Sequence, residues 1–267
     1  MTTSLFISDL HLDPGRPEGI ELFEDFIRHR AVDADQLFIL GDLFEYWLGD
    51  DACEHSGYQA IAESLAVLAC HNTKVYFMHG NRDFLVSKDF ASSISGCLLP
   101  DPSVFKLNNL DALLMHGDSL CTDDVAHQQF RAATRSKAWQ QDILSKSIDE
   151  REEIARQLRA NSQQGNAEKI ESIMDVNQSA VESFMLEHNV KLLIHGHTHR
   201  TAIHEFQLAG EMAHRIVLGD WYQKGNYLLH DETKFSLLSY PDDTVLATVN
   251  IANCSEEKTT ALRKHQA

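Results

Sequence analysis

Short apolar runs recur along the first part of the chain, and each is followed by a turn that carries glycine and polar residues. Three of these runs predict buried strands, at Ser4–Ser8, Gln36–Leu40 and Lys74–Met78. Between them, apolar residues fall at helical spacing over Gly19–Ala31, and a second helix is expected over Gly57–Ala69. Strands that alternate with helices through short loops favour an α/β fold with largely parallel pairing.

The pattern changes after two further strand-like runs, Ser103–Leu107 and Asp111–Met115. Residues 122–188 contain no convincing strand, and most of their positions are good helix formers. We expect two or three helices there, with breaks near Ser145–Ser147 and within Asn161–Asn166. Because this segment interrupts the series of strands, we interpret it as an inserted helical cap.

Strand-like patterns return in the last third of the chain. The apolar run Val190–Ile194 predicts a buried strand. We therefore assign residues 1–121 and 189–252 to one core, and residues 253–267 to a polar C-terminal tail that we expect to fray. Five short runs that resemble antiparallel strands follow Val190–Ile194: Ala202–Leu208, His214–Leu218, Asn226–Leu229, Phe235–Tyr240 and Thr244–Ile251.

The amino-acid composition and net charge limit which kinds of molecule this protein is expected to bind. Of the 267 residues 43% are hydrophobic and 24% charged, which is ordinary for a globular protein with a full core. The net charge of −17 makes a nucleic acid an unfavourable partner. Between Cys121 and Ile170, however, eight acids balance eight bases, so the whole excess of negative charge lies elsewhere. A locally basic segment suggests contact with an anionic group, although a solvated helical face would have the same composition.

The cysteine content and the hydropathy of the chain indicate the cellular compartment in which the protein is expected to work. The five cysteines have no C-x-x-C spacing, so a disulfide framework is not expected and a reducing compartment is the simplest inference. The N-terminus lacks the pattern of a signal peptide, and no apolar run approaches the roughly 18 residues that span a bilayer. We therefore expect a cytoplasmic protein that does not cross a membrane, with attachment to a membrane surface left open.

Candidate chemistry lies in the turns that follow five of the predicted strands. These turns carry carboxylates, imidazoles and one amide but no thiolate. Such a set of oxygen and nitrogen ligands suits Mn²⁺, Fe²⁺, Zn²⁺ or Mg²⁺. Seven ligands exceed what one ion takes while keeping an open position, whereas two ions that share a carboxylate would use them well. Asp42 is the best candidate for that bridge, because it stands alone on its turn. The candidate metal ligands are Asp9, His11, Asp42, Asn81, His116, His197 and His199.

Each of these turns is weak evidence when taken alone. His195–Arg200 could be an ordinary histidine-rich turn, and a single histidine such as His116 is more often a hydrogen-bonded structural residue. Five such turns in order, each after an apolar run, are hard to obtain by chance. Two ions about 3.5–4 Å apart can hold a bridging hydroxide and clamp phosphoryl oxygens. The pattern therefore favours hydrolysis of a phosphoester or phosphoanhydride.

The series of motifs resembles the calcineurin-like metallophosphoesterase superfamily. The resemblance implies a sandwich of two mixed β-sheets flanked by helices, with a dimetal site at the strand ends. It also implies that Asp42 is shared between two ions. The first ion would take Asp9, His11, Asp42 and His199, and the second Asp42, Asn81, His116 and His197. The motifs that carry the resemblance are Asp9-x-His11, Gly41–Asp42, Gly80–Asp83, His116–Asp118 and Gly196–His199.

Arg82 departs from the form that many members of this superfamily have. Those members carry a histidine after the asparagine, positioned to protonate an alkoxide leaving group. Arginine does not donate a proton at neutral pH, but it pairs well with phosphate oxygens. Arg82 therefore favours cleavage of a pyrophosphate, whose leaving group is already a stable anion. The alternative is that Arg82 only forms a salt bridge with Asp83 or Asp9.

In finer detail the chain is similar to one branch, the UDP-2,3-diacylglucosamine pyrophosphatases of lipid A synthesis. The resemblance implies a Mn²⁺-dependent phosphoric anhydride hydrolase with two Mn²⁺ ions. Metal-bound hydroxide would attack the α-phosphorus, and UMP and 2,3-diacylglucosamine 1-phosphate (lipid X) would be released. Another dimetal phosphodiesterase or nucleotide pyrophosphatase would share every metal ligand and is the alternative. The stretches that match this branch are Ser8–Leu12, Gly41–Trp47, His79–Asp83, Met115–Asp118, Leu120–Asp124, Ile173–Asn177 and His195–Arg200.

The same resemblance implies roles for individual residues. Asp42, Asn81, Arg82 and His116 would be catalytic. His127 stands where the branch often has a tyrosine, which leaves the role of that position open. The implied substrate contacts are Asn81, Arg82, Asp124, Ser162, Asn166, Lys169 and His197.

The predicted cap combines an apolar stripe with positive charge. Such a segment suits a substrate with acyl chains and an anionic head, and it could rest on the cytoplasmic face of the inner membrane as a peripheral contact. An ordinary helical hairpin packed on the core is an equally good interpretation of the same stripe. No protein partner can be inferred. The stripe comprises Phe130, Trp139, Ile143, Leu144, Ile154 and Leu158, and the charges are Arg131, Arg135, Lys137, Arg156, Arg159 and Lys169.

Overall fold

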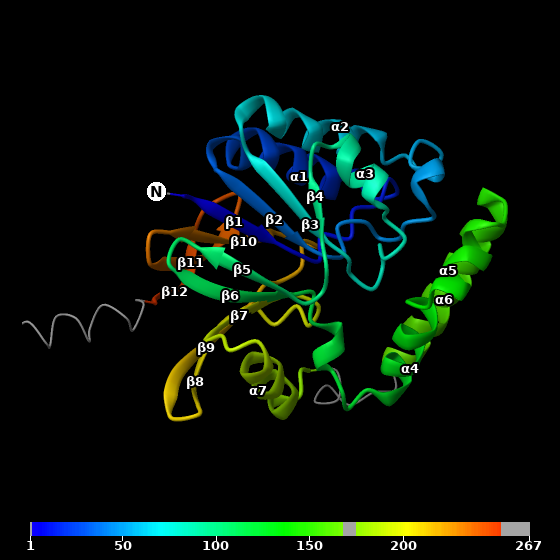
Figure 1. Cartoon of the computed structure of the whole chain (residues 1–267). Coiled ribbons are helices and arrows are strands. Elements are labelled where there is room, and N and C mark those ends of the chain that lie inside the picture. The colour runs from blue at the N-terminus through cyan, green and yellow to red at the C-terminus, as the bar shows by residue number, and fades with distance from the viewer. Residues whose placement is uncertain (1, 168–174, 252–267) are drawn as a thin grey trace, which may run out of the picture.

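Two β-sheets face each other in the computed structural model, which describes residues 2–167 and 175–251 (Figure 1). The first sheet has seven strands in the order β12-β11-β10-β1-β2-β3-β4, and the second has five in the order β5-β6-β7-β9-β8. The strands of the first sheet are β1 (Ser4–Ile7), β2 (Gln36–Leu40), β3 (Lys74–Met78), β4 (Cys97–Leu99), β10 (Gly225–Asp231), β11 (Lys234–Tyr240) and β12 (Val245–Asn250). The strands of the second are β5 (Ser103–Leu107), β6 (Leu110–Met115), β7 (Leu192–His195), β8 (Ala202–Leu208) and β9 (Glu211–Val217).

Each sheet contains a parallel block bordered by antiparallel strands. In the first sheet β1, β2, β3 and β4 run parallel, while β10, β11 and β12 continue the sheet antiparallel from β1. In the second sheet β6, β7 and β9 run parallel, and β5 and β8 pair antiparallel at the two edges. The expected sandwich of two mixed sheets is therefore confirmed. Parallel strands share one carboxyl edge, so the turns after them can meet there.

Alternating side chains of the buried strands divide between two layers of core. Phe6 and Phe38 point between the sheets, where their rings stack 4.6 Å apart at the centroids. Ile7 and Ile39 point to the opposite face and pack beneath the helices. Those helices are α1 (Pro17–His29), α2 (Gln59–Val67) and α3 (Lys88–Ser93), and α7 (Gln178–Glu187) covers the outer face of the second sheet.

The helical insertion differs in detail from the prediction. It forms α4 (Val125–Thr134), α5 (Lys137–Leu144) and α6 (Ile148–Ala167), which stand to one side of the sheets in Figure 1. The break near Ser145–Ser147 is present. The break within Asn161–Asn166 is not, since α6 continues to Ala167. One glycine among polar residues lowers helix stability by only about 1 kcal/mol, which leaves the helix free to continue.

Helix α7 belongs structurally with the second sheet. Val181 and Met185 are fully buried against Leu113 and Leu193 of β6 and β7. The bounds 122–188 for the cap stay a prediction. Because α7 lies within this range but packs on the second sheet, it belongs with the core rather than with the cap helices. The predicted tail, residues 253–267, lies outside the described residues.

Other differences are small. The short elements α3 and β4 were not predicted, because six and three residues are too few for a periodic pattern. The described residues also contain four 3₁₀ turns: η1 (Ala31–Asp33), η2 (Asp50–Ala52), η3 (Leu68–His71) and η4 (Asp118–Leu120). Among the described residues, the structure has no helix whose length and hydropathy would let it span a bilayer.

Candidate metal centre

Sharp turns follow the strands that end at the shared edge. Asp9 and His11 follow β1, Asp42 follows β2, and His197 and His199 follow β7. All five have left-handed backbone conformations, with φ values of 57°, 49°, 53°, 66° and 59° respectively. Residues other than glycine rarely adopt this conformation, and each instance costs of order 1–3 kcal/mol unless its surroundings enforce it. Five instances at one edge are a mark of a functional site.

Glycines precede several of these ligands because the turns approach one another closely. A Cβ atom on Gly80 would lie 2.0 Å from Oδ1 of Asp42, and one on Gly196 would lie 2.1 Å from Oγ of Ser8. Side chains of any size are therefore excluded at these two positions. Glycine recurs in the motifs because the backbones of neighbouring turns pack directly against each other there. This close approach brings the side chain that follows each glycine into the candidate metal site.

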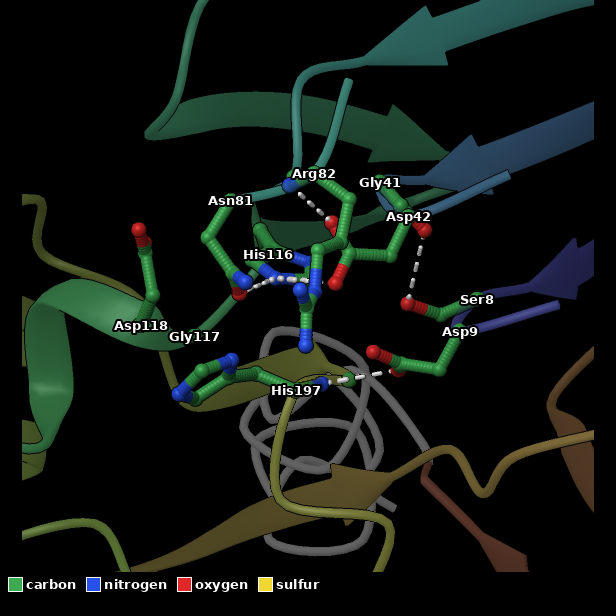
Figure 2. A network of polar contacts seen from close by, with 12 residues as sticks. Ser8, Asp9, Gly41, Asp42, Asn81, Arg82, His116, Gly117, Asp118 and His197 are labelled. Carbon is green, nitrogen blue, oxygen red and sulfur yellow. Dashed lines mark hydrogen bonds and ion pairs between the residues drawn. The ribbon is translucent and has the colours of Figure 1, made fainter. Parts of the chain in front are cut away.

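Five of the seven predicted ligands fall into two groups of neighbouring ligand atoms. Asp9, His11 and His199 offer ligand atoms within 4.8 Å of one another, and so do Asp9, Asp42 and His116. Figure 2 shows Asp9, Asp42, His116 and Asn81 arranged around a common centre. Asp9, His11, Asp42 and His116 are buried, whereas the other three predicted ligands are half-buried. The two overlapping groups indicate two neighbouring metal positions rather than one.

Asp42 lies between the two groups. Its Oδ2 atom is 3.9 Å from Nε2 of His11 and 3.8 Å from Nε2 of His116. Asn81 completes the second group, with its Oδ1 atom 3.0 Å from Nε2 of His116. Asp9 is also common to both groups, which the sequence did not suggest. The role of Asp42 as the bridge stays a prediction, and its nearly equal distances to the two histidines support it.

His197 is oriented differently from the other predicted ligands. Its backbone N–H donates to Oδ2 of Asp9 at 2.8 Å. Its ring lies 5.1 Å from that of His116 and 5.2 Å from that of His127, measured between centroids. The ring points away from Asp9 in Figure 2. His197 thus reaches the site from its rim, and its place among the ligands of the second ion stays a prediction.

The pKa shifts reflect closely packed opposite charges. Burial raises the pKa of Asp42 to about 7. Burial opposes the charged form of His116, but the carboxylates of Asp42 and Asp9 prevail and raise its pKa to about 9. In the same way, hydrogen bonds to Asp220 and Asp9 outweigh burial and raise the pKa of His199 to about 10. Protons and metal ions therefore compete for the same ligands.

The donor set fits divalent cations. Oδ1 of Asp9 is buried, and although Nε2 of His199 lies 3.3 Å away, the geometry of that contact does not satisfy the oxygen within the described residues. A buried carboxylate oxygen is stable only with a cation or a donor beside it. Carboxylate, imidazole and amide oxygen together are typical ligands of Mn²⁺, Fe²⁺, Zn²⁺ and Mg²⁺. The arrangement therefore supports a dimetal site without choosing the metal.

Arg82 points into this centre in Figure 2. Its backbone N–H donates to Oδ1 of Asp42 at 2.8 Å, which fixes the turn. Its Nε atom is buried and has no hydrogen-bond partner within residues 2–167 and 175–251. No ion pair joins Arg82 to Asp83 or Asp9 in that part of the chain, in contrast to the salt-bridge alternative. The guanidinium is half-buried and lies near the carboxylates of Asp42 and Glu45. Because its Nε atom has no hydrogen-bond partner among the described residues, it is suited to an anionic ligand.

Three residues that support the ligands were not predicted. Asp220 lies with Oδ2 3.3 Å from Nδ1 of His199, and Asp83 accepts hydrogen bonds from the backbone of Leu43 and Gly80, each at 2.8 Å. Glu45 is buried next to His11. Asp220 follows strand β9 as the ligands follow theirs, so the same rule would have found it. Asp83 and Glu45 lie within the motifs described above, but nothing in their residue type or position indicated that they support the ligands.

A cleft of about 600 Å³ joins the metal site to the cap. Five of the six residues of the predicted apolar stripe line it, whereas Leu144 is exposed to solvent. Arg159 lines it too. Arg131 and Arg135 do not supply free positive charge, because Asp118 binds both, with Nε of Arg131 at 2.8 Å. The five lining residues are Phe130, Trp139, Ile143, Ile154 and Leu158.

The predicted substrate contacts are only partly placed. Asp124 lines the cleft and caps α4, where Oδ1 accepts from the backbone of His127 at 3.1 Å. Asn81, Arg82 and His197 line the same cleft. Ser162 and Asn166 fall within α6, but their side chains lie outside the described part of the structure, as does the whole of Lys169.

Comparison with known proteins agrees with this geometry. The sequence pattern described as calcineurin-like phosphoesterase matches residues 2–201. A protein of Chromohalobacter salexigens named UDP-2,3-diacylglucosamine hydrolase is 50% identical over 219 residues, which cover 82% of this chain and 89% of that protein. One of the same name from Stenotrophomonas maltophilia is 47% identical, covering 88% and 97%. The solved structure of Yfce, a phosphoesterase from E. coli, covers 94% of this chain and 100% of its own at 17% identity, with a TM-score of 0.47. The chain belongs to the calcineurin-like phosphoesterase family and, within it, to the group of UDP-2,3-diacylglucosamine hydrolases.

Proposed function

We propose that this protein hydrolyses the pyrophosphate bond of UDP-2,3-diacylglucosamine in lipid A synthesis, with attack at the α-phosphorus. The products are UMP and 2,3-diacylglucosamine 1-phosphate. The observation that carries the proposal is one continuous cleft, which is lined both by residues of the metal site with Arg82 and by apolar residues of the cap. A substrate with a charged head and acyl chains matches both ends, as the names of the relatives suggest.

When bound, two divalent ions at this site, which we propose to be Mn²⁺, would supply an activated water and would neutralise charge on the phosphoryl oxygens. Asp9, His11, Asp42 and His199 are proposed to hold one ion, and Asp42, Asn81, His116 and His197 the other. The Arg82 guanidinium pairs with oxygens of the departing phosphate and stabilises its negative charge. Because that phosphate is already a stable anion, the step needs no proton donor at this position.

The cap contributes binding of the lipid. Phe130, Trp139 and Ile143 face the cleft, where burial of acyl methylenes is favourable by about 0.8 kcal/mol each. Asp124, Ser162, Asn166 and Lys169 are proposed as further contacts from the cap. Val125 and Leu144 are exposed on α4 and α5, with 61% and 44% of their surface accessible. We propose that this side of the cap contacts the cytoplasmic face of the inner membrane, from which the substrate is drawn.

Hydrolysis in ¹⁸O-water followed by ³¹P analysis of the products tests the proposal. With Mn²⁺ present, label is expected in UMP, because attack occurs at the α-phosphorus. Label in the lipid phosphate would overturn that assignment. Bis-nucleoside polyphosphates and cyclic nucleotides should not be cleaved at comparable rates, and efficient cleavage of either would favour another dimetal phosphodiesterase or nucleotide pyrophosphatase.

Arg82→Lys separates phosphate recognition from metal binding. Lysine keeps the charge but loses the planar fork. A hydrogen bond to a charged group contributes about 1.5–3 kcal/mol, so kcat/KM is expected to fall about 10- to 150-fold. Mn²⁺ affinity, measured by calorimetry, should not change. An unchanged kcat/KM would show that Arg82 does not contact the substrate.

A further inference from the structure

Glu45 is a buried acid whose role the ligand set leaves unexplained. It lies three residues beyond Asp42, and only 2% of its side chain is exposed. The loop after β2 pairs there with the loop after β1: the backbone N–H of Glu45 donates to the carbonyl of Leu12 at 2.9 Å. This pairing sets the Glu45 carboxylate beside the imidazole of His11.

Two polar atoms that lack a hydrogen bond face each other across this gap. Nδ1 of His11 and Oε2 of Glu45 are both buried, and neither makes a hydrogen bond within the described residues. The distance between them is 3.7 Å. A movement of about 0.7 Å would bring them within hydrogen-bonding distance. Buried groups of this kind are normally paired, so each atom is the natural partner of the other.

Two arginines hold the carboxylate in place. Nη2 of Arg16 lies 3.6 Å from Oε2, and Nε of Arg159 lies 3.3 Å from Oε1. Arg16 also donates to the carbonyl of His11 at 2.6 Å, which ties it to the same turn. Arg159 comes from α6 in the cap. Glu45 therefore joins a predicted metal ligand, the turn that carries it and the cap.

His199, which lies with His11 in the first group of candidate ligands, has a carboxylate at the same ring position. Nδ1 of His199 lies 3.3 Å from Oδ2 of Asp220, which leaves Nε2 of His199 directed at Asp9. A histidine that binds a metal through one ring nitrogen usually donates the other N–H to a carboxylate or carbonyl, which fixes its tautomer and orientation. Asp220 does this for His199, and Glu45 is placed to do it for His11.

We propose that Glu45 is a positioning residue for the metal site: its carboxylate accepts the Nδ1 hydrogen of His11, so that Nε2 is presented to the ion, while Arg159 links this contact to the cap. The inference rests on the proposed function only in its need for a metal ion. It requires no particular substrate, so metal binding can be measured without one.

Calorimetric titration of the metal-free protein with Mn²⁺ tests the proposal. Glu45→Ala is expected to weaken binding of one of the two ions about 10- to 100-fold, the range found for partners of metal-bound histidines. Glu45→Gln keeps an oxygen that accepts the same hydrogen bond, so its loss should be smaller. Activity of Glu45→Ala should recover as Mn²⁺ is raised, which a general loss of structure would not allow.

Asp51→Asn is the matched control. Asp51 accepts from Nη1 of Arg151 at 2.8 Å and so joins α6 to the core, as Glu45 does through Arg159. It contacts no predicted metal ligand in the described part of the chain, and Mn²⁺ affinity should be unchanged. Unchanged affinity in both Glu45 variants, or an equal loss in Asp51→Asn, would overturn the proposal. If the parent binds Mn²⁺ but does not hydrolyse the lipid, the proposed function fails instead.

Discussion

The metal-ligand turns and the helical cap border the same cleft but are held by different interactions. The turns are joined by backbone hydrogen bonds, such as Asp9 N–H to the Gly41 carbonyl at 3.1 Å and Gly196 N–H to the His116 carbonyl at 2.8 Å. The cap is joined largely by arginine side chains. Arg135 donates to the Gly80 carbonyl at 2.9 Å, and Arg151 to the Leu48 carbonyl at 2.6 Å.

This difference separates two requirements of the proposed reaction. Metal ligands must keep their mutual geometry, and backbone pairing between buried strand ends provides that rigidity. A cap that admits a lipid must release and rebind, and a few long side chains need less free energy to release than a packed turn. Substitutions in the turns should therefore act on chemistry or folding, while those at the cap contacts should act on substrate capture.

The largest effect is expected at the shared carboxylate. Asp42→Ala removes the residue that lies between both histidines, and the loss of several kcal/mol of electrostatic stabilisation corresponds to a fall in kcat of about 10³-fold or more. Hydrolysis at saturating Mn²⁺ measures it. Asp111→Ala, an exposed acid at the far end of β6, is the control. Full activity in Asp42→Ala would mean that the metals are not catalytic.

The next largest effect is expected where the cap meets the core. Asp118 is fully buried and accepts from Arg131 at 2.8 Å. Asp118→Asn leaves that arginine without its charged partner, and breaking a buried pair costs about 3–5 kcal/mol. Urea unfolding at pH 7 measures the loss. A change below about 1 kcal/mol would show that the pair is not a structural anchor.

We also expect the loss of stability in Asp118→Asn to depend on pH. Although burial alone would raise the pKa of Asp118, the charges of His116 and Arg131 hold it well below its usual range. A carboxyl with a lower pKa in the folded state stabilises the protein above its unfolded pKa, about 3.9, and loses that contribution as pH falls through the folded value. The stability difference between parent and Asp118→Asn should therefore shrink below about pH 4. A constant difference down to pH 2 would contradict this assignment.

Backbone packing in the turns can be tested with one methyl group. Gly80→Ala places a Cβ atom 2.0 Å from Oδ1 of Asp42, and overpacking of this kind costs typically 1–3 kcal/mol. Mn²⁺ affinity should fall as well. Gly19→Ala, in α1 with no atom within 4 Å of the new Cβ, should stabilise the protein by up to about 1 kcal/mol. Thermal melts of both variants measure the contrast. Equal melting temperatures would show that the turns are not tightly packed.

The smallest effect on stability is expected at the ion pair between Asp51 of the core and Arg151 of the cap. The Asp51 side chain is 60% exposed, so Asp51→Asn should change the free energy of unfolding by less than about 1 kcal/mol. Its effect should instead be seen in KM for the lipid substrate, with kcat unchanged. A fall in kcat with constant KM would place this contact in the rigid part of the site.

Much of the fold could be predicted because its strands are short buried runs. Gln36–Leu40 and Lys74–Met78 were predicted with the bounds that the structure has. The convergence of Asp9, Asp42 and His116 was predicted from their places after such runs. The elements that were missed or altered, α3, β4 and the continuous α6, depend on three to six residues or on weak propensities that neighbouring structure overrides.

The sequence by itself was enough to predict which residues would gather at the candidate metal site, because a ligand after a buried strand is a local pattern. Tertiary structure alone decided that Asp9 is common to both groups, that Glu45 faces His11, and that Asp118 takes up the charge of Arg131. These relations join residues from separate turns, and no local pattern encodes them. They follow from the way two sheets bring the carboxyl ends of their parallel strands to one edge.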